Sequence, residues 1–293
     1  MSLFPVCIFA FNRPKHIEKT LNALSSNFLS KDTDVVVYVD GPRCVEDEKS
    51  VSEVRSVLDN FVGFRSFKVK YQSQNLGLAS SIIGGVTEVL SDHEAVIVLE
   101  DDLITQPNFL NYMNDALRFY ANADKISTIC GFSHDLPELE FWSDDIYFGY
   151  RPSSWGWGTW KKEWFEMVWE HNHYKRIIKN PINWLKLFRG GSDVPQMLIN
   201  QLTGKINSWA IRWTSSQMMA EKLAVFPRKS LVLNDGIGEL ATNTKRSLRF
   251  TTNLDQSNRV NFNFLAHPKV DKSLMRSFRN KYSILSRLRD KII

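Results

Sequence analysis

The chain has 293 residues, of which 43% are hydrophobic and 24% charged, and this predicts a globular protein of one large domain with at most a small appendage. No apolar stretch approaches the roughly 20 residues that span a bilayer, and the first residues lack the basic segment of a secretory signal. Three cysteines, Cys7, Cys44 and Cys130, show no paired spacing, which indicates a reducing compartment and predicts a cytoplasmic protein.

The net charge of +5 is concentrated at the C-terminus. Residues 272–293 carry seven cations and one acid, a net of +6, so the rest of the chain is slightly acidic and predicts no nucleic-acid partner. Ile284, Leu285, Leu288 and Ile292 recur there at helical spacing among the basic residues. Two interpretations remain open: a helix that lies on an anionic membrane surface, and a solvated helix whose apolar stripe packs on the domain.

The first half of the chain alternates strands and helices. Apolar runs predict strands over 4–11, 34–39, 67–71 and 95–99. Helical spacing follows each run, over about 14–24, 46–61, 78–90 and 107–120. This order is typical of right-handed βαβ units and predicts an α/β fold with a doubly wound, mostly parallel sheet.

The second half is less regular. Strands are predicted over 126–131 and 146–150, short strands within 224–233, and helices over 161–169 and 208–222, whereas 175–191 receives no assignment. The segment 151–160, RPSSWGWGTW, is interpreted as a glycine-rich ligand loop with tryptophan walls, with plain tryptophan packing as the alternative. The polar segment 234–246 is either a loop that folds over a diphosphate or an ordinary surface loop.

Polar residues follow each of the four predicted strands. They are Asn12-Arg13, Asp40-Gly41, Asn75-Leu76-Gly77 and Glu100-Asp101-Asp102. Ligands of open α/β sheets bind beyond the carboxyl ends of the strands, so these residues are expected to converge. Three adjacent carboxylates repel one another, and a hard cation such as Mn²⁺ or Mg²⁺ would remove that cost while holding phosphates. The alternative is a solvated acidic turn before a helix.

Together these motifs resemble nucleotide-sugar glycosyltransferases of the GT-A (Rossmann-like) fold. More narrowly, they resemble bacterial sugar transferases distantly similar to N-acetylglucosaminyltransferases with a Glu-Asp-Asp metal motif. The resemblance covers about residues 4–245. The matching segments are Phe11-Asn12-Arg13-Pro14, Asp40-Gly41, Gln74 to Leu78, Glu100 to Asp102, Gly156-Trp157-Gly158, Ser208-Trp209 with Trp213, and Asn234 with Gly236 to Thr244.

The resemblance implies a role for each matching position. The donor-binding residues would be Phe11, Asn12, Arg13, Asp40, Gly41, Asn75, Gly77, Glu100, Asp101, Lys245 and Arg246. Asp102 would bind the metal that bridges the diphosphate, and Trp155, Gly156 and Trp157 would border the donor sugar or the acceptor. A cation with Lys245 or Arg246 would stabilise the charge that grows on the leaving nucleotide.

Two positions depart from the family pattern. The segment Asn207-Ser208-Trp209-Ala210 lacks the carboxylate expected to act as general base, and Ala241-Thr242-Asn243-Thr244 lacks a metal-binding histidine. An inverting transfer needs a base beside the acceptor hydroxyl, and Asp135 and Glu239 are the candidates. A retaining mechanism would not need that base.

The predicted organisation is a GT-A domain over 1–270 and a basic amphipathic tail over 271–293. The domain would comprise a nucleotide-binding half, 1–131, and an acceptor-side half, 132–270. The predicted function is metal-dependent transfer of a hexose or N-acetylhexosamine from a nucleotide sugar, as a UDP-sugar, to a glycan or lipid-linked acceptor in surface polysaccharide or glycoconjugate synthesis. The alternatives are a non-catalytic nucleotide-sugar or glycan-binding protein and a nucleotidyltransferase. The expected location is cytoplasmic, with peripheral attachment to the inner face of the membrane as an option.

Overall fold

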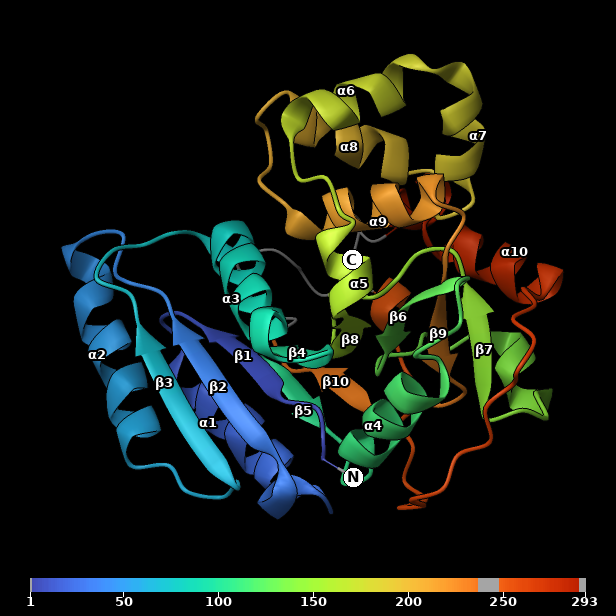
Figure 1. The fold of residues 1–293 in the computed structure, drawn as a ribbon. Helices are drawn as coiled ribbons and strands as arrows, with labels where there is room; N and C mark the ends of the chain where they lie inside the picture. The colour runs from blue at the N-terminus through green and yellow to red at the C-terminus, as the bar shows by residue number, and fades with distance from the viewer. Residues whose placement is uncertain (1, 237–247, 290–293) are drawn as a thin grey trace.

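The computed structural model describes residues 2–236 and 248–289. Eight strands form one mixed sheet in the order β3-β2-β1-β4-β8-β6-β9-β7 (Figure 1). They are Val6–Ala10 (β1), Asp34–Val39 (β2), Ser66–Tyr71 (β3), Ala95–Glu100 (β4), Ile126–Cys130 (β6), Ile146–Gly149 (β7), Trp157–Trp160 (β8) and Leu223–Pro227 (β9). Six of these strands run in one direction and only β7 and β8 oppose them, which confirms the predicted α/β class with a mostly parallel sheet.

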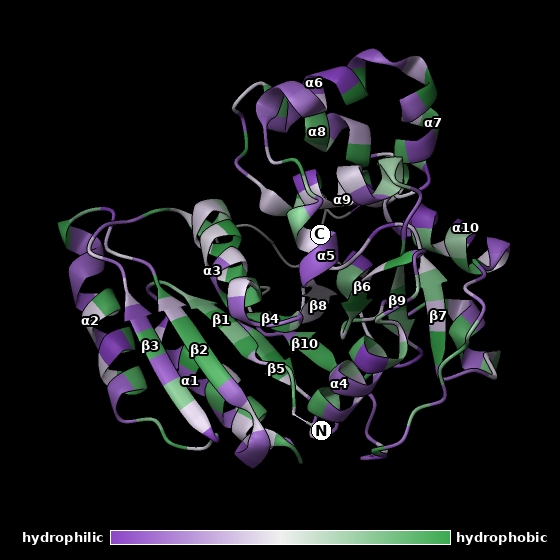
Figure 2. Cartoon of the chain, in the orientation of Figure 1, coloured by the Kyte–Doolittle hydropathy of each residue, from purple (hydrophilic) through white to green (hydrophobic). Residues whose placement is uncertain are grey.

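The parallel half of the sheet is buried on both faces. Helices α1 (Pro14–Ser25) and α2 (Val45–Asp59) cover one face, where Val6 and Ile8 of β1 point, whereas α3 (Leu78–Asp92) covers the other, with Cys7 and Phe9. Because both sets of alternating residues need an apolar neighbour, β1 and β4 read as continuous hydrophobic runs (Figure 2). This is why the sequence pattern located these strands.

The glycine-tryptophan segment is partly a strand. Residues Trp157–Trp160 form β8, which lies antiparallel between β4 and β6, with Ile97 paired to Gly158. A Cβ on Gly158 would lie 3.0 Å from the carbonyl oxygen of Val96, so a glycine suits this close packing. The prediction of a ligand loop over the whole of 151–160 is therefore wrong for its last four residues.

A helical lobe follows β8 and lies over one end of the sheet (Figure 1). Its helices are α5 (Lys161–Phe165), α6 (His171–Lys179), α7 (Pro181–Phe188), α8 (Val194–Leu202) and α9 (Trp209–Met219). Tyr174, Ile177, Leu187 and Leu198 form the apolar centre of the lobe. The segment 175–191, which the sequence left unassigned, is thus mostly helical.

Two short antiparallel strands, β5 (Leu103–Thr105) and β10 (Val232–Asn234), pair beside the main sheet. Helix α4 (Phe109–Phe119) follows β5 and packs on the sheet through Phe109, Met113 and Leu117. The pairing of β5 with β10 matters for function because it brings Asn234, at the start of the segment 234–246, next to Leu103, which directly follows Asp102.

The C-terminal segment divides into two helices with different surroundings. Helix α10 (Lys272–Lys281) buries Leu274, Met275 and Phe278 in a cluster that also contains Tyr147 and Phe226 of the sheet. Helix α11 (Ile284–Arg289) instead leaves Ile284, Leu285 and Leu288 exposed. Over residues 2–236 and 248–289, none of the helices has the length and apolar character needed to cross a bilayer.

Candidate active site

The acids after β4 meet an arginine that follows β1. Because β1 and β4 are parallel neighbours, with Phe9 paired to Glu100, the residues after each strand lie side by side. Arg13 forms an ion pair with Asp101 and a second with Asp102, in which Nη1 lies 3.0 Å from Oδ2. Burial lowers the pKa of Arg13, but the two carboxylates outweigh this effect and raise it. The predicted convergence of Arg13 with the acidic triplet is therefore present.

The three acids of the triplet lie close together beside one arginine. Asp101 and Asp102 are 3% and 9% exposed. Burial raises the pKa of Glu100 to about 8, with a further increase from Asp102 and Asp101, and burial also raises the pKa of Asp101. Both shifts favour the neutral acids, mainly because of burial, and a cation bound here would instead favour their ionised forms.

One oxygen of Asp102 has no partner among residues 2–236 and 248–289. Oδ2 accepts from Arg13, whereas Oδ1 is buried and makes no hydrogen bond within these ranges. Unpaired buried oxygens are uncommon, and this one fits a hard cation. In the described ranges no three Asp, Glu, His or Cys side chains are grouped to hold a metal. Carboxylate oxygens are the ligands that Mg²⁺ and Mn²⁺ prefer, so the chemistry of the Asp102 side chain fits such a cation.

The segment after β10 lies against this acid. The backbone amide of Asp235 donates to the carbonyl oxygen of Asp102 at 2.8 Å, and the Asp235 carboxylate pairs with Lys19 at 2.6 Å. A Cβ on Gly236 would collide with the Asp102 carboxylate, so only glycine allows this approach. The predicted residues further along, Glu239, Lys245 and Arg246, lie outside the described residues, and their roles stay predictions.

Asp40 organises the loop after β3. Its Oδ1 accepts from the amide of Leu76 at 2.7 Å, and its Oδ2 accepts from that of Gly77 at 2.9 Å. Asn75 donates to the carbonyl oxygen of Gly41 at 2.9 Å. The buried Asp40 carboxylate therefore holds this loop, and the donor-binding role that the resemblance implies for Asp40 stays a prediction. A cavity of about 190 Å³, lined in part by Asp40 and Leu76, opens beside it.

Asn12 and Phe11 are held by residues that sequence reasoning missed. The Asn12 amide donates to Asp47 at 2.8 Å, and Asp47 also pairs with Arg43 at the same distance. Hydrogen bonds from Arg43, followed by that from Asn12, hold the pKa of Asp47 well below its usual range. The Arg43 guanidinium lies over the Phe11 ring, 4.9 Å from its centroid. Arg43 lies soon after β2, in the turn that begins with Asp40-Gly41, and this position was the available signal.

The two tryptophans predicted to border the ligand, Trp155 and Trp157, have different surroundings in the structure. Trp155 is half-buried and packs on Phe132, with ring centroids 4.6 Å apart. Trp157 is 1% exposed and stacks on Trp209 at 4.8 Å, which leaves no ring face for a sugar. Trp157 therefore packs in the protein interior, which was the alternative to the predicted ligand contact. Between them, Gly156 has a φ of +62° and accepts a hydrogen bond from the amide of Gly131 at 2.6 Å.

The candidate base Asp135 is exposed on the loop that follows β6. Since β6 runs in the same direction as β4, Asp135 lies at the carboxyl-end side of the sheet, and β8 separates the two strands. The start of α9 presents Ser208, whose hydroxyl accepts from the amide of Ile211 at 3.3 Å. Ser208 is thus a helix cap, and the role of Asp135 stays a prediction.

The fold and this site define a class. Four parallel strands, an antiparallel strand beside them and an acidic triplet after the fourth are features of a nucleotide-sugar glycosyltransferase of the GT-A fold. Residues 6–192, more than half of the 293-residue chain, match the family described as Glycosyl transferase family 2. The chain belongs to that family.

Several solved structures are similar at low identity. S. aureus TarS 1-349 is 13% identical, covering 80% of this chain and 60% of that chain, with a TM-score of 0.43. The same segment in complex with UDP is 21% identical over 44% of this chain and 34% of that chain, with a TM-score of 0.31. An active-site mutant of LgtC is 9% identical over 75% and 72%, with a TM-score of 0.40. The chain spans less than two thirds of the length of these TarS chains, and no curated protein matches it.

Proposed function

We propose that this protein is a cation-dependent glycosyltransferase that uses a nucleotide sugar, with a UDP-sugar as the donor and a hexose or N-acetylhexosamine as the group transferred. The single observation that carries the proposal is the buried Oδ1 of Asp102, next to the ion pair with Arg13, which has no hydrogen-bond partner among the residues that the structure describes. Family membership supports the reaction class.

The residues suggest how the donor would be oriented. The loops fixed by Asp40 and by Asp47 would border the base and ribose together with Phe11 and Asn12. Arg13 would release part of its contact with Asp102 when a diphosphate arrives, because the phosphate oxygens accept from the same guanidinium. Mn²⁺ or Mg²⁺ at Asp102 would supply positive charge to the leaving diphosphate.

Donor hydrolysis tests the proposal. The protein is incubated with a panel of nucleotide sugars and Mn²⁺, with and without EDTA, and the released nucleoside diphosphate is measured. We expect release from at least one UDP-sugar, and we expect EDTA to abolish it. In a parallel incubation with added pyrophosphate, release of sugar phosphate together with nucleoside triphosphate would instead indicate a nucleotidyltransferase. Binding without turnover, which the absence of a carboxylate around Ser208-Trp209 favours, would indicate a non-catalytic binding protein.

We further propose that the acceptor is a glycan or lipid-linked glycan and that α11 contacts an anionic membrane surface. Ile284, Leu285 and Leu288 are exposed on this helix, which also carries Arg287 and Arg289. Apolar insertion and roughly 1 kcal/mol per cation near the surface would combine.

Sedimentation with anionic liposomes tests the membrane contact. Replacing Ile284 and Leu288 by serine should reduce liposome binding without changing turnover of a soluble donor. Point variants are preferable to truncation before α10, because that truncation would uncover Tyr147 and Phe226. Unchanged liposome binding would remove the membrane role.

A further inference from the structure

Arg43 combines a fixed position with an exposed side chain. Its Nε and Nη2 atoms donate to the Asp47 carboxylate at 2.8 and 3.1 Å, and its backbone amide donates to the same carboxylate at 3.3 Å. Asp47 lies in the first turn of α2 and is 6% exposed, whereas the Arg43 side chain is 56% exposed. A two-point contact with a buried carboxylate fixes the plane of a guanidinium, so Arg43 presents a flat, oriented cation to solvent.

An aromatic ring supports this guanidinium. Arg43 Cζ lies over the ring of Phe11, 4.9 Å from its centroid, and Phe11 is half-buried directly after β1. Asn12, the next residue, donates from its amide to Asp47 Oδ1 at 2.8 Å, so the same carboxylate holds the loop after β1. Because Phe11 and Asp47 both contact Arg43 and its side chain stays exposed, the guanidinium can receive a second flat group on its solvent side. Guanidinium planes stack on aromatic faces in this way.

Arg43 lies beside the candidate donor site. In the strand order β3-β2-β1-β4, the chain changes direction across the sheet at β1 and β4, and ligands of open α/β sheets bind beyond the carboxyl ends of the strands at such a point. Arg13 pairs with Asp102 there and follows Phe11 by two residues, which span at most about 7 Å of chain. A nucleotide whose diphosphate meets Arg13 and Asp102 can therefore place its base near Arg43.

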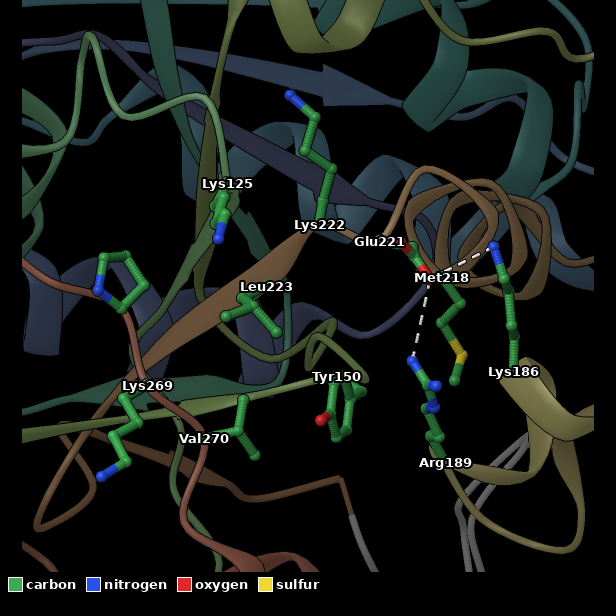
Figure 3. A pocket seen from close by; sticks show the side chains of 11 residues that line it. Lys125, Tyr150, Lys186, Arg189, Met218, Glu221, Lys222, Leu223, Lys269 and Val270 are labelled. Carbon is green, nitrogen blue, oxygen red and sulfur yellow. Dashed lines mark ion pairs between the residues drawn. The ribbon is translucent and has the colours of Figure 1, made fainter.

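A second group of cations lacks this fixation. A cavity of about 410 Å³ lies at the amino ends of β6 and β9, on the side of the sheet opposite to Asp102 (Figure 3). Its Glu221 lies 3.3 Å from Lys186 and 4.0 Å from Arg189 but is 61% exposed, and Lys269 points away from them (Figure 3). These cations are not held by a buried group and do not converge, so the cavity does not define a ligand site.

We propose that the base of the donor nucleotide stacks on the exposed side of the Arg43 guanidinium, which Asp47 and Phe11 hold in place. This inference rests on the proposed function, because it takes the donor to be a nucleotide sugar. Stacking requires the flat face of the guanidinium and not only its charge, so a lysine cannot replace Arg43. Arg43 should therefore contribute to donor affinity through the base and not through the diphosphate.

Calorimetric titration with a nucleoside diphosphate and, separately, with inorganic pyrophosphate distinguishes the base from the diphosphate. Both titrations contain Mg²⁺, and the nucleotide is the member of a UDP, GDP, CDP and ADP panel that the wild-type protein binds most tightly. Arg43→Ala should weaken nucleotide binding about tenfold and leave pyrophosphate binding unchanged. Arg43→Lys should lose as much nucleotide affinity as Arg43→Ala, because lysine keeps the charge but lacks the plane.

The matched control is Arg65→Ala. It removes an arginine that is similarly exposed and pairs with Asp34, at the start of β2 and therefore at the far end of the strand from Arg43. This variant should change neither affinity, and circular dichroism should show that all three variants are folded.

Unchanged nucleotide binding in Arg43→Ala, or full recovery of affinity in Arg43→Lys, would overturn the stacking role. Equal losses for nucleotide and pyrophosphate would overturn it as well, because they would show that Arg43 acts through its charge on the phosphates. In each of these outcomes the wild-type protein binds the nucleotide, so the proposed function stands. If the wild-type protein bound no nucleoside diphosphate, the proposed function and this inference would both fail.

Discussion

Arg13 Nη1 lies 3.0 Å from Asp102 Oδ2, and this contact joins the loops that follow two neighbouring parallel strands. The other oxygen of the same carboxylate is buried and has no partner in the described part of the chain. Arg13 thus orients the acid and leaves one of its oxygens available to a ligand. The first two predictions test the two partners of this contact separately.

Asp102→Asn should reduce cation-dependent donor turnover by about 100-fold or more, because the amide keeps the shape of the side chain but removes the charge that would hold the cation. The measurement is released nucleoside diphosphate across a Mn²⁺ titration. Circular dichroism and the thermal midpoint serve as the folding control and should remain close to those of the wild-type protein. Full activity in this variant would contradict the metal assignment.

Arg13→Met should destabilise the fold by about 3 kcal/mol, because it leaves the buried Asp101 and Asp102 carboxylates without their cation. Urea unfolding at pH 7 measures the loss. Asp101→Asn in the Arg13→Met background should recover part of it, since a neutral amide needs no counter-charge. If the two substitutions were simply additive, the ion pair would not be the source of the destabilisation.

Stability should fall with acid through His134. The imidazole is buried and its Nε2 lies 2.9 Å from the hydroxyl of Tyr282. Burial, with smaller effects from Lys281 and Arg151, lowers the pKa of His134 to about 3. The unfolded chain therefore binds the proton more tightly, and the stabilisation that is complete above about pH 6.5 is lost as the pH falls toward 3.

His134→Phe should flatten this dependence. The difference in unfolding free energy between pH 7 and pH 5 should be about 2 kcal/mol smaller in the variant than in the wild-type protein. Urea titrations at both pH values provide the comparison, and the difference cancels acid effects of other groups. An identical slope in the two proteins would show that folding does not change the pKa of His134.

Two glycines offer a matched test of the donor-site loops. A Cβ on Gly41 would lie 2.5 Å from the backbone of Gln74, so Gly41→Ala should cost about 1–3 kcal/mol and disturb the loop that Asp40 holds. A Cβ on Gly84, in the middle of α3, would meet nothing within 4 Å. Gly84→Ala should instead stabilise the protein by about 0.5–1 kcal/mol. Thermal unfolding would distinguish the expected loss of stability in the first variant from the expected gain in the second. Similar losses of stability in both variants would contradict the packing argument.

The parallel half of the fold could be predicted because its signals are local. Continuous apolar strands such as β4 end in polar residues, and the common direction of β1–β4 places Arg13 beside Asp101 without knowledge of tertiary contacts. The roles of Arg43 and Asp47 were not predicted. They depend on the directions of the Asn12 and Phe11 side chains, which no strand pattern specifies.

Strand β8, helices α6 to α8 and the packing of α10 were not predicted, because they depend on contacts between residues that are distant in sequence. Strand β8 has only four residues, too few for an alternation to be recognised, so Trp157 read as part of a loop. Helices α6 to α8 are short and join through Asn180 and Gly190-Gly191, which hides a continuous helical period. The packing of Leu274 and Phe278 of α10 could not be predicted, because their partners Tyr147 and Phe226 lie far away in the sequence.

The antiparallel placement of β8 has a consequence for dissecting this protein. A fragment ending at residue 131 would contain β4 but lack the strand that covers its outer side, since Ala95 to Val98 pair with Trp157 to Trp160. Those four residues would then expose free amides and carbonyls along an apolar ribbon, a template for self-association between copies. The nucleotide-binding half is therefore expected to precipitate when it is expressed alone, although its motifs are complete in sequence.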